Sequence, residues 1–126
     1  MPVYPPKFQS WLKAFVDDRD AASGTVHLHL GGHLDLAAAV DVGLKLRRDL
    51  QRLRPGHKLA GAALERGAPV VGGSFLGDDG ARAAALPVRN AAGEIRAVVS
   101  VAFDDRDVDD DTLGALSREV SAVPSI

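Results

Sequence analysis

The chain has 126 residues, of which 46% are hydrophobic and 25% are charged, and its formal net charge is −2 at pH 7. This length suits a single domain over residues 1–126, and the composition excludes the low-hydrophobicity, high-charge signature of disorder. The absence of cysteine excludes disulfides, thiol nucleophiles and thiolate metal sites.

The first predicted element is an amphipathic helix over about residues 7–20. Its apolar residues recur at helical spacing, and Pro5 and Pro6 suit its first turn. The apolar stripe contains the only tryptophan, Trp11, and a large aromatic side chain contributes most when it is buried. We therefore expect this helix to dock on the core or on a partner.

A β-hairpin follows, because residues 26–30 and 34–36 alternate apolar and polar types on either side of a glycine pair. A two-residue loop, Gly31-Gly32, would mix the two types on each face. A three-residue loop that includes His33 keeps one face apolar, and we predict this register. It places three polar residues together on the other face: His27, His29 and Asp35.

This polar trio has two alternative interpretations. Two histidines at a spacing of two, with a nearby carboxylate, are suitable ligands for zinc or iron. Polar residues on a sheet face, with His29 and Asp35 as a cross-strand pair, are the simpler interpretation. Because no fourth ligand is indicated, we expect no metal and no other cofactor, and we keep the metal site as an alternative.

Two short helices are predicted next, over residues 44–53 and 57–66. Leucines recur at intervals of four and three in the first, and Gly67 is a natural C-terminal stop for the second. Nucleic acid is not an expected partner, because the net charge is negative and hardly any aromatic residue lies among the arginines of this region. Four arginines form a candidate site for an anionic ligand or an acidic protein surface: Arg47, Arg48, Arg52 and Arg54.

Three strands and a helix complete the predicted elements, over residues 68–71, 81–90, 94–103 and 109–122. Pro87 argues against a central strand, unless it extends past the end of the short first strand. The aspartates that precede the last helix suit its N-terminus, where they can cap it and complement its dipole. Narrow apolar stripes on the terminal helices must be buried, so a mixed α+β domain with one mainly antiparallel sheet is the predicted packing.

The middle of the chain resembles the GAF family. Residues 59–70, LAGAALERGAPV, look like the GAF helix that bears a glycine and leads into a short strand. Residues 86–88, the turn at Gly93 and the strand over 98–103 are similar to the rest of the family pattern, so that the resemblance covers about residues 24–123. It implies a GAF/PAS-like, profilin-like sheet with the N- and C-terminal helices on one face and short middle helices over a ligand pocket on the other.

The resemblance also implies a function. It indicates a regulatory or signalling module that binds a small molecule or a protein partner in trans. The cysteines of bilin-binding and free methionine sulfoxide reductase members are absent, and so is the asparagine-lysine and phenylalanine-aspartate-glutamate signature of cyclic-nucleotide-binding members. We therefore predict a module that is not an enzyme.

The implied pocket has a floor of small residues with larger apolar residues above it. The same small residues would equally allow close helix packing with no cavity. The predicted lining residues are Leu59, Val71, Phe75, Ala83, Ala85, Ser100 and Ala102.

The competing hypothesis is a ligand-free dimerisation or protein-interaction adaptor of roadblock or profilin type. Terminal helices often form the dimer interface of GAF domains, so the resemblance implies a homodimer through these helices. The N-terminal region lacks the continuous apolar stretch of a signal peptide, and no apolar run approaches the length of a membrane span. We expect a cytoplasmic protein with no membrane partner. The predicted interface residues are Trp11, Phe15, Leu116 and Val120.

Overall fold

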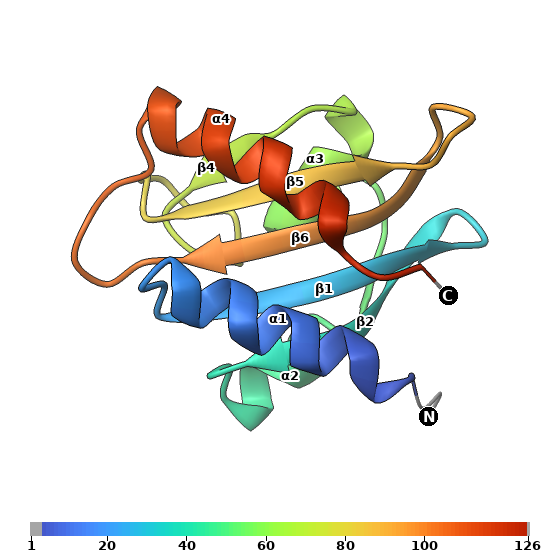
Figure 1. Cartoon of the computed structure of the whole chain (residues 1–126), viewed down its shortest axis with the longest axis horizontal. Helices are drawn as coiled ribbons and strands as arrows, with labels where there is room; N and C mark the ends of the chain where they lie inside the picture. The colour runs from blue at the N-terminus through green and yellow to red at the C-terminus, as the bar shows by residue number, and fades with distance from the viewer. Residues whose placement is uncertain (1–3, 126) are drawn as a thin grey trace.

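A computed structural model describes residues 4–125. Six strands form one antiparallel sheet in the order β3-β2-β1-β6-β5-β4. The helices lie in pairs on its two faces, α1 and α4 on one face and α2 and α3 on the other (Figure 1). This is the predicted α+β arrangement. The elements are α1 (Pro6–Asp18), β1 (Ser23–Leu30), β2 (His33–Val40), α2 (Leu44–Asp49), β3 (Arg52–Leu53), α3 (Lys58–Arg66), β4 (Val70–Gly72), β5 (Ala83–Arg89), β6 (Ile95–Ala102), α4 (Asp110–Glu119) and a 3-10 turn (Val120–Ala122).

Strands β1 and β6 pair at the centre of the sheet, where residues 23–28 lie opposite residues 97–102. Side chains on one face of this pair, such as Val99, pack against α1 and α4. Side chains on the other face, such as Val98, pack with residues of α3. Because both faces are covered, these strands need apolar residues at successive positions instead of a strict alternation.

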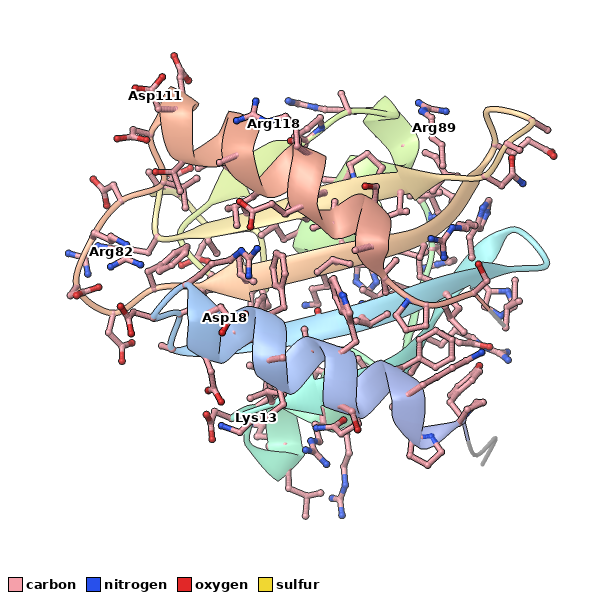
Figure 2. All side chains as sticks on the ribbon, in the orientation of Figure 1. Lys13, Asp18, Arg82, Arg89, Asp111 and Arg118 are labelled. Atoms are coloured by element: carbon pink, nitrogen blue, oxygen red, sulfur yellow. The ribbon has the colours of Figure 1, made fainter. Side chains whose placement is uncertain are left out.

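Helix α1 approaches the sheet closely at Gly24. A Cβ atom there would lie 2.7 Å from Cγ2 of Val16, so any other residue would force the Val16 side chain or its helix to shift. The outward side of α1 carries charged residues, including Lys13 and Asp18, which point away from the sheet (Figure 2). Within residues 4–125, no helix combines the length and the apolar character that crossing a membrane requires.

The terminal helices turn their apolar stripes inward. Phe15, Leu116 and Val120 are 4%, 2% and 1% exposed, and they belong to the apolar cluster between the helices and the sheet. Trp11 is half-buried and stacks on Phe15, with 4.8 Å between ring centroids. Three of the four residues predicted for a dimer interface therefore hold α1 and α4 on their own sheet. The homodimer itself stays a prediction.

The predicted register of the first hairpin is wrong. The loop contains two residues, Gly31 and Gly32, with φ angles of 60° and 84°, and Leu30 pairs with His33. Two successive glycines in the left-handed region suit a two-residue hairpin turn whose twist matches that of the strands. The mixed faces that argued against this register are tolerated, because helices cover both faces and a register shift after Val26 resets the pattern toward the end of β2.

Other differences lie at element ends. The helix predicted over 44–53 ends at Asp49, and a two-residue strand, β3, follows and pairs with Leu34 and Asp35 of β2. Pro87 lies inside β5, next to the central pair, but β4 pairs only as far as Ala85. The missing N–H of Pro87 therefore costs no hydrogen bond to β4, as the alternative interpretation of this proline predicted.

Two glycines in helices should respond oppositely to replacement by alanine, one losing and one gaining stability. A Cβ at Gly61 of α3 would lie 2.5 Å from the backbone oxygen of Arg54, whereas a Cβ at Gly114 of α4 meets only the Arg118 side chain at 3.7 Å. We predict that Gly61→Ala lowers the free energy of unfolding by about 1–3 kcal/mol through overpacking. Gly114→Ala should raise it by about 0.5–1 kcal/mol, because alanine favours the helix. Urea unfolding at pH 7 measures both, and a neutral Gly61→Ala would contradict the tight contact.

Candidate functional site

The sheet face under α3 contains most of the predicted pocket residues. Ala83 and Ala85 of β5 are 0% exposed and pack with Leu59 and Phe75, which lie above them. Ser100 and Ala102 of β6 are on the same face, as partners of Ala85 and Ala83 in the pairing with β5. Small residues here allow close helix packing, the second of the two outcomes left open by the sequence.

Val71 is the exception among the predicted lining residues. It is 37% exposed and pairs with Ala84, whose side chain belongs to the cluster on the terminal-helix face. The prediction reversed the two faces of β4: Val70, its neighbour, packs with α3 instead. A strand of three residues has too little alternation for its faces to be assigned from sequence.

Three polar side chains lie on this covered face. Thr25 and His27 of β1 and Ser100 of β6 are each 1% exposed, and they are the only buried polar or charged residues among residues 4–125. Thr25 pairs directly with Ser100, which places their Cβ atoms about 4.5–5.5 Å apart. His27 follows two positions after Thr25 on the same face, about 7 Å along the strand. We call Thr25, His27 and Ser100 the polar cluster.

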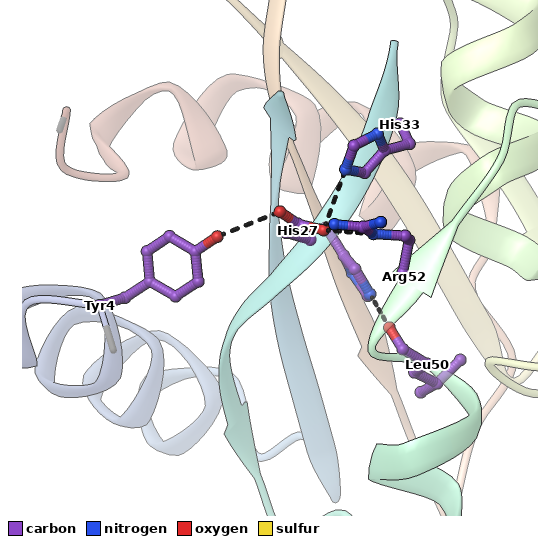
Figure 3. Close-up of polar contacts among 6 residues, drawn as sticks. Tyr4, His27, His33, Leu50 and Arg52 are labelled. Carbon is purple, nitrogen blue, oxygen red and sulfur yellow. Dashed lines mark hydrogen bonds and ion pairs between the residues drawn. The ribbon is translucent and has the colours of Figure 1, made fainter. Parts of the chain in front are cut away.

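The polar cluster has unused hydrogen-bonding capacity. Thr25 Oγ1, Ser100 Oγ and His27 Nδ1 have no partner within the described part of the chain. His27 Nε2 lies 2.8 Å from the backbone oxygen of Leu50, which follows α2 (Figure 3). A carbonyl oxygen only accepts, so Nε2 donates to it, and Nδ1 is left as an acceptor that faces no donor.

Burial keeps His27 neutral. Removal of the imidazole from water lowers its pKa from 6.5 to about 4, and the hydrogen bond to Leu50 offsets only part of that effect. At neutral pH the polar cluster therefore offers two hydroxyl groups and one acceptor nitrogen, without charge. Sequence reasoning missed Thr25 and treated His27 either as a metal ligand or as an ordinary polar residue on a sheet face. The available signal was polar residues at alternate positions of an otherwise apolar strand.

The proposed metal trio is not assembled. His29 lies on the same face as His27, where its Nδ1 is 2.8 Å from the backbone oxygen of Ile95. Asp35 lies on the opposite face of β2, since the corrected register pairs it with Leu28, a residue of the terminal-helix face. Across residues 4–125, no three histidine or carboxylate residues are grouped as a metal ion requires.

Asp35 instead joins the first strands to the segment before α1. Its carboxylate lies 3.4 Å from the hydroxyl of Tyr4, 3.4 Å from Nε of Arg52 and 3.2 Å from Nε2 of His33 (Figure 3). Partial burial and the Asp35 carboxylate raise the pKa of the Tyr4 phenol. This group is explained by a structural role as a junction between Tyr4, β2 and β3.

The four arginines of the predicted anion site do not converge. Arg47 reaches the backbone oxygen of Ala39 at 3.4 Å, in an open depression beside α1. Arg54 lines a different depression with His57 and Glu65, and Arg52 pairs with Asp35 as described. Arg48 is exposed on α2. A single anion could not contact the whole set.

No family model matches the sequence, and no curated protein sequence matches it significantly. Solved structures do match. The GAF domain of an Acinetobacter phosphoenolpyruvate-protein phosphotransferase has a TM-score of 0.69 and 16% identity, over 92% of this chain and 78% of its own. A type II free methionine-R-sulfoxide reductase from Thermoplasma acidophilum has a TM-score of 0.70 and 16% identity, over 90% of this chain and 83% of its own. A Staphylococcus aureus NreA protein mutated in its nitrate binding site has a TM-score of 0.63 and 15% identity, over 82% of this chain and 88% of its own.

The chain therefore has the GAF fold, as the resemblance implied. The prediction that it is not an enzyme is corrected by the same comparisons. Free methionine-R-sulfoxide reductases are among the matched structures, so the GAF fold carries enzymes as well as regulatory domains. At these identities the fold is what is shared, and the residues of the site must decide the function.

The buried imidazole makes stability depend on pH. The pKa of His27 falls from 6.5 in the unfolded chain to about 4 in the folded one, so the unfolded state binds the proton first as the pH decreases. We predict a loss of about 3 kcal/mol of unfolding free energy from this residue between pH 7 and pH 4. His27→Gln, which can still donate to Leu50, should lose about 3 kcal/mol less than the wild type over this range.

Urea unfolding at pH 7, 5.5 and 4 measures this difference, which separates His27 from the carboxylates that titrate in both proteins. The matched control is His57→Gln, since His57 is exposed and its side chain caps nothing. Between pH 7 and pH 4, His57→Gln should lose as much unfolding free energy as the wild type. An identical pH dependence in His27→Gln and the wild type would contradict a neutral, buried His27.

Proposed function

We propose that this chain is a regulatory domain that binds a small, uncharged polar molecule at the polar cluster, on the sheet face that carries α2 and α3. The observation that carries the proposal is the position of Thr25, His27 and Ser100: all the buried polar side chains of residues 4–125 lie together, each with an unpartnered atom. A buried polar group without a partner costs about 1–3 kcal/mol of stability, so such a group is expected to have one in its working state.

The chemistry of the cluster favours an uncharged ligand with at least one N–H or O–H donor. His27 Nδ1 can only accept, because Nε2 donates to Leu50. The hydroxyls of Thr25 and Ser100 can donate or accept. No buried side chain within residues 4–125 carries a charge to pair with an ionic ligand, and the burial of an unpaired charge is far costlier than that of a dipole.

Entry of a ligand requires the cover to move. Helix α3 contacts the sheet through small side chains, Ala60 and Ala63, which leave little room above the strands. Its first turn is fixed by a hydrogen bond of 3.1 Å from Leu59 N to the oxygen of Phe75. A ligand that displaces α3 would select a second position of this helix, and such a shift in population is what makes a binding domain regulatory.

Proteins that share the fold support a small polar ligand. Among the matched structures, NreA has a nitrate binding site, and the reductases act on free methionine sulfoxide. The site described here lacks a buried cation for nitrate, and the 126 residues contain no cysteine for thiol-based reduction. These differences favour neutral molecules, such as primary amides and short polyols, as the proposed ligands.

The test compares the wild type with the double variant Thr25→Val and Ser100→Ala. Replacing unpartnered hydroxyls by apolar groups of similar shape should leave the unfolding free energy unchanged or raise it by about 1 kcal/mol. A panel of primary amides and short polyols should raise the melting temperature of the wild type for at least one member, because a ligand that binds only the native state stabilises it. The double variant should lose this rise.

Ser117→Ala is the matched control, because Ser117 lies on α4 and donates to the backbone oxygen of Leu113. It should keep the rise in melting temperature. The proposal fails if the double variant is destabilised by more than about 2 kcal/mol, since the hydroxyls would then have structural partners. It also fails if only nitrate and formate stabilise the wild type, or if the rise persists in the double variant.

A further inference from the structure

A groove of about 250 Å³ runs along the outer side of α3, away from the polar cluster. Helix α3 contributes one stripe of residues at intervals of four, Lys58, Ala62 and Arg66. Strand β4 and the loop that follows it form the opposite wall. The remaining lining residues are Gly56, Leu59, Val70, Val71, Leu76 and Gly77.

Exposed apolar side chains are concentrated in this groove. Within residues 4–125, the large apolar residues that are exposed are Leu44, Val71 and Leu76, at 67%, 37% and 48%. Leu76 lines the groove from the loop after β4, next to the buried Leu59, and Val71 borders it at the edge strand, with its side chain on the face away from α3. Two of the three exposed large apolar residues therefore lie at one depression. Exposed apolar residues grouped in this way indicate a surface that is buried when a partner binds.

Unpaired cations mark the two ends of the groove. Lys58 begins α3 and Arg66 ends it, so a helical rise over eight residues separates their backbones by about 12 Å. In the described part of the chain, neither side chain has a carboxylate within ion-pairing distance. The groove therefore combines the exposed side chain of Leu76 with a cation at each end of its α3 wall.

The strand beside the groove favours an extended occupant. Strand β4 is at the edge of the sheet and pairs only with β5. The outer backbone groups of an edge strand are the usual place for an added peptide strand. About 12 Å corresponds to three or four residues of extended chain at about 3.3 Å each.

We propose that this groove binds an extended peptide segment of a partner protein, with apolar residues at its centre and a carboxylate side chain at each end. Leu76 contacts the apolar residues, the edge strand at Val71 lies beside them, and Lys58 and Arg66 pair with the carboxylates. The proposal does not depend on the ligand at the polar cluster, which lies on the other side of α3.

A second copy of this chain does not supply such a segment from its acidic run. Asp107, Val108 and Asp109 have the required order of acidic and apolar residues. However, Val108 is 6% exposed and belongs to the core of its own domain, so it is not available to a neighbour. The occupant that we propose is therefore a segment of another protein, and a second copy is an outcome that the test distinguishes.

The probe is a fluorescein-labelled synthetic peptide with a glutamate at each end and three valine or leucine residues between them. We expect saturable binding by fluorescence anisotropy, weakened at least tenfold by Leu76→Asp and by Arg66→Glu. Leu44→Asp and Arg48→Glu are the matched controls, since both residues are exposed and lie outside the groove. They should bind as the wild type does. Affinity should also fall as salt increases.

Circular dichroism checks that each variant is folded, and exposed Arg66 provides a test even if Leu76→Asp does not fold. The proposal is overturned if the peptide does not saturate, or if the two control variants weaken binding as much as the groove variants. It is also overturned if decanoate, an apolar carboxylate, binds at the same residues more tightly than the peptide. Sedimentation that shows a dimer of this chain, lost in Leu76→Asp, would assign the groove to a second copy instead.

Discussion

The pairing of β1 with β6 is the contact on which the rest of the structure depends. These strands are far apart in the sequence and lie at the centre of the sheet. On its outer side, β1 pairs with β2, and β6 pairs with β5. Helices cover both faces of the pair, so its side chains join both apolar clusters. The pairing also sets Thr25 opposite Ser100, and it thereby creates the polar cluster.

The polar cluster opposes the stability that the same pairing provides. An apolar residue at each of its positions would complete the core under α3, whereas the three unpartnered atoms each cost about 1–3 kcal/mol. In the proposed function, a ligand supplies the hydrogen bonds that these buried groups lack. The hydrogen bond from His27 to Leu50 has a different role, since it joins the central strand to the end of α2.

Helix α3 connects the two proposed sites. Its inner side packs on the sheet face that contains the polar cluster, and its residues Lys58, Ala62 and Arg66 line the groove. A displacement of this helix by a small molecule would change the groove as well, so binding at one site would be coupled to binding at the other. Enzymes and regulatory domains share the GAF fold, so these two surfaces, and not the fold, carry the functional argument.

The sequence by itself determined the fold class and the order of the main elements, because hydrophobic periodicity and glycine stops are local signals. The placement of both terminal helices on one face of the sheet came from the resemblance to the GAF family. The sequence did not determine the hairpin register, the orientation of Val71 or the two-residue strand β3, since these depend on which faces other elements cover. Only the tertiary structure brought Thr25 together with Ser100, which are 75 positions apart in sequence numbering (100 minus 25). It likewise turned Phe15 and Leu116 inward, because whether an apolar stripe meets its own sheet or a partner is decided by packing.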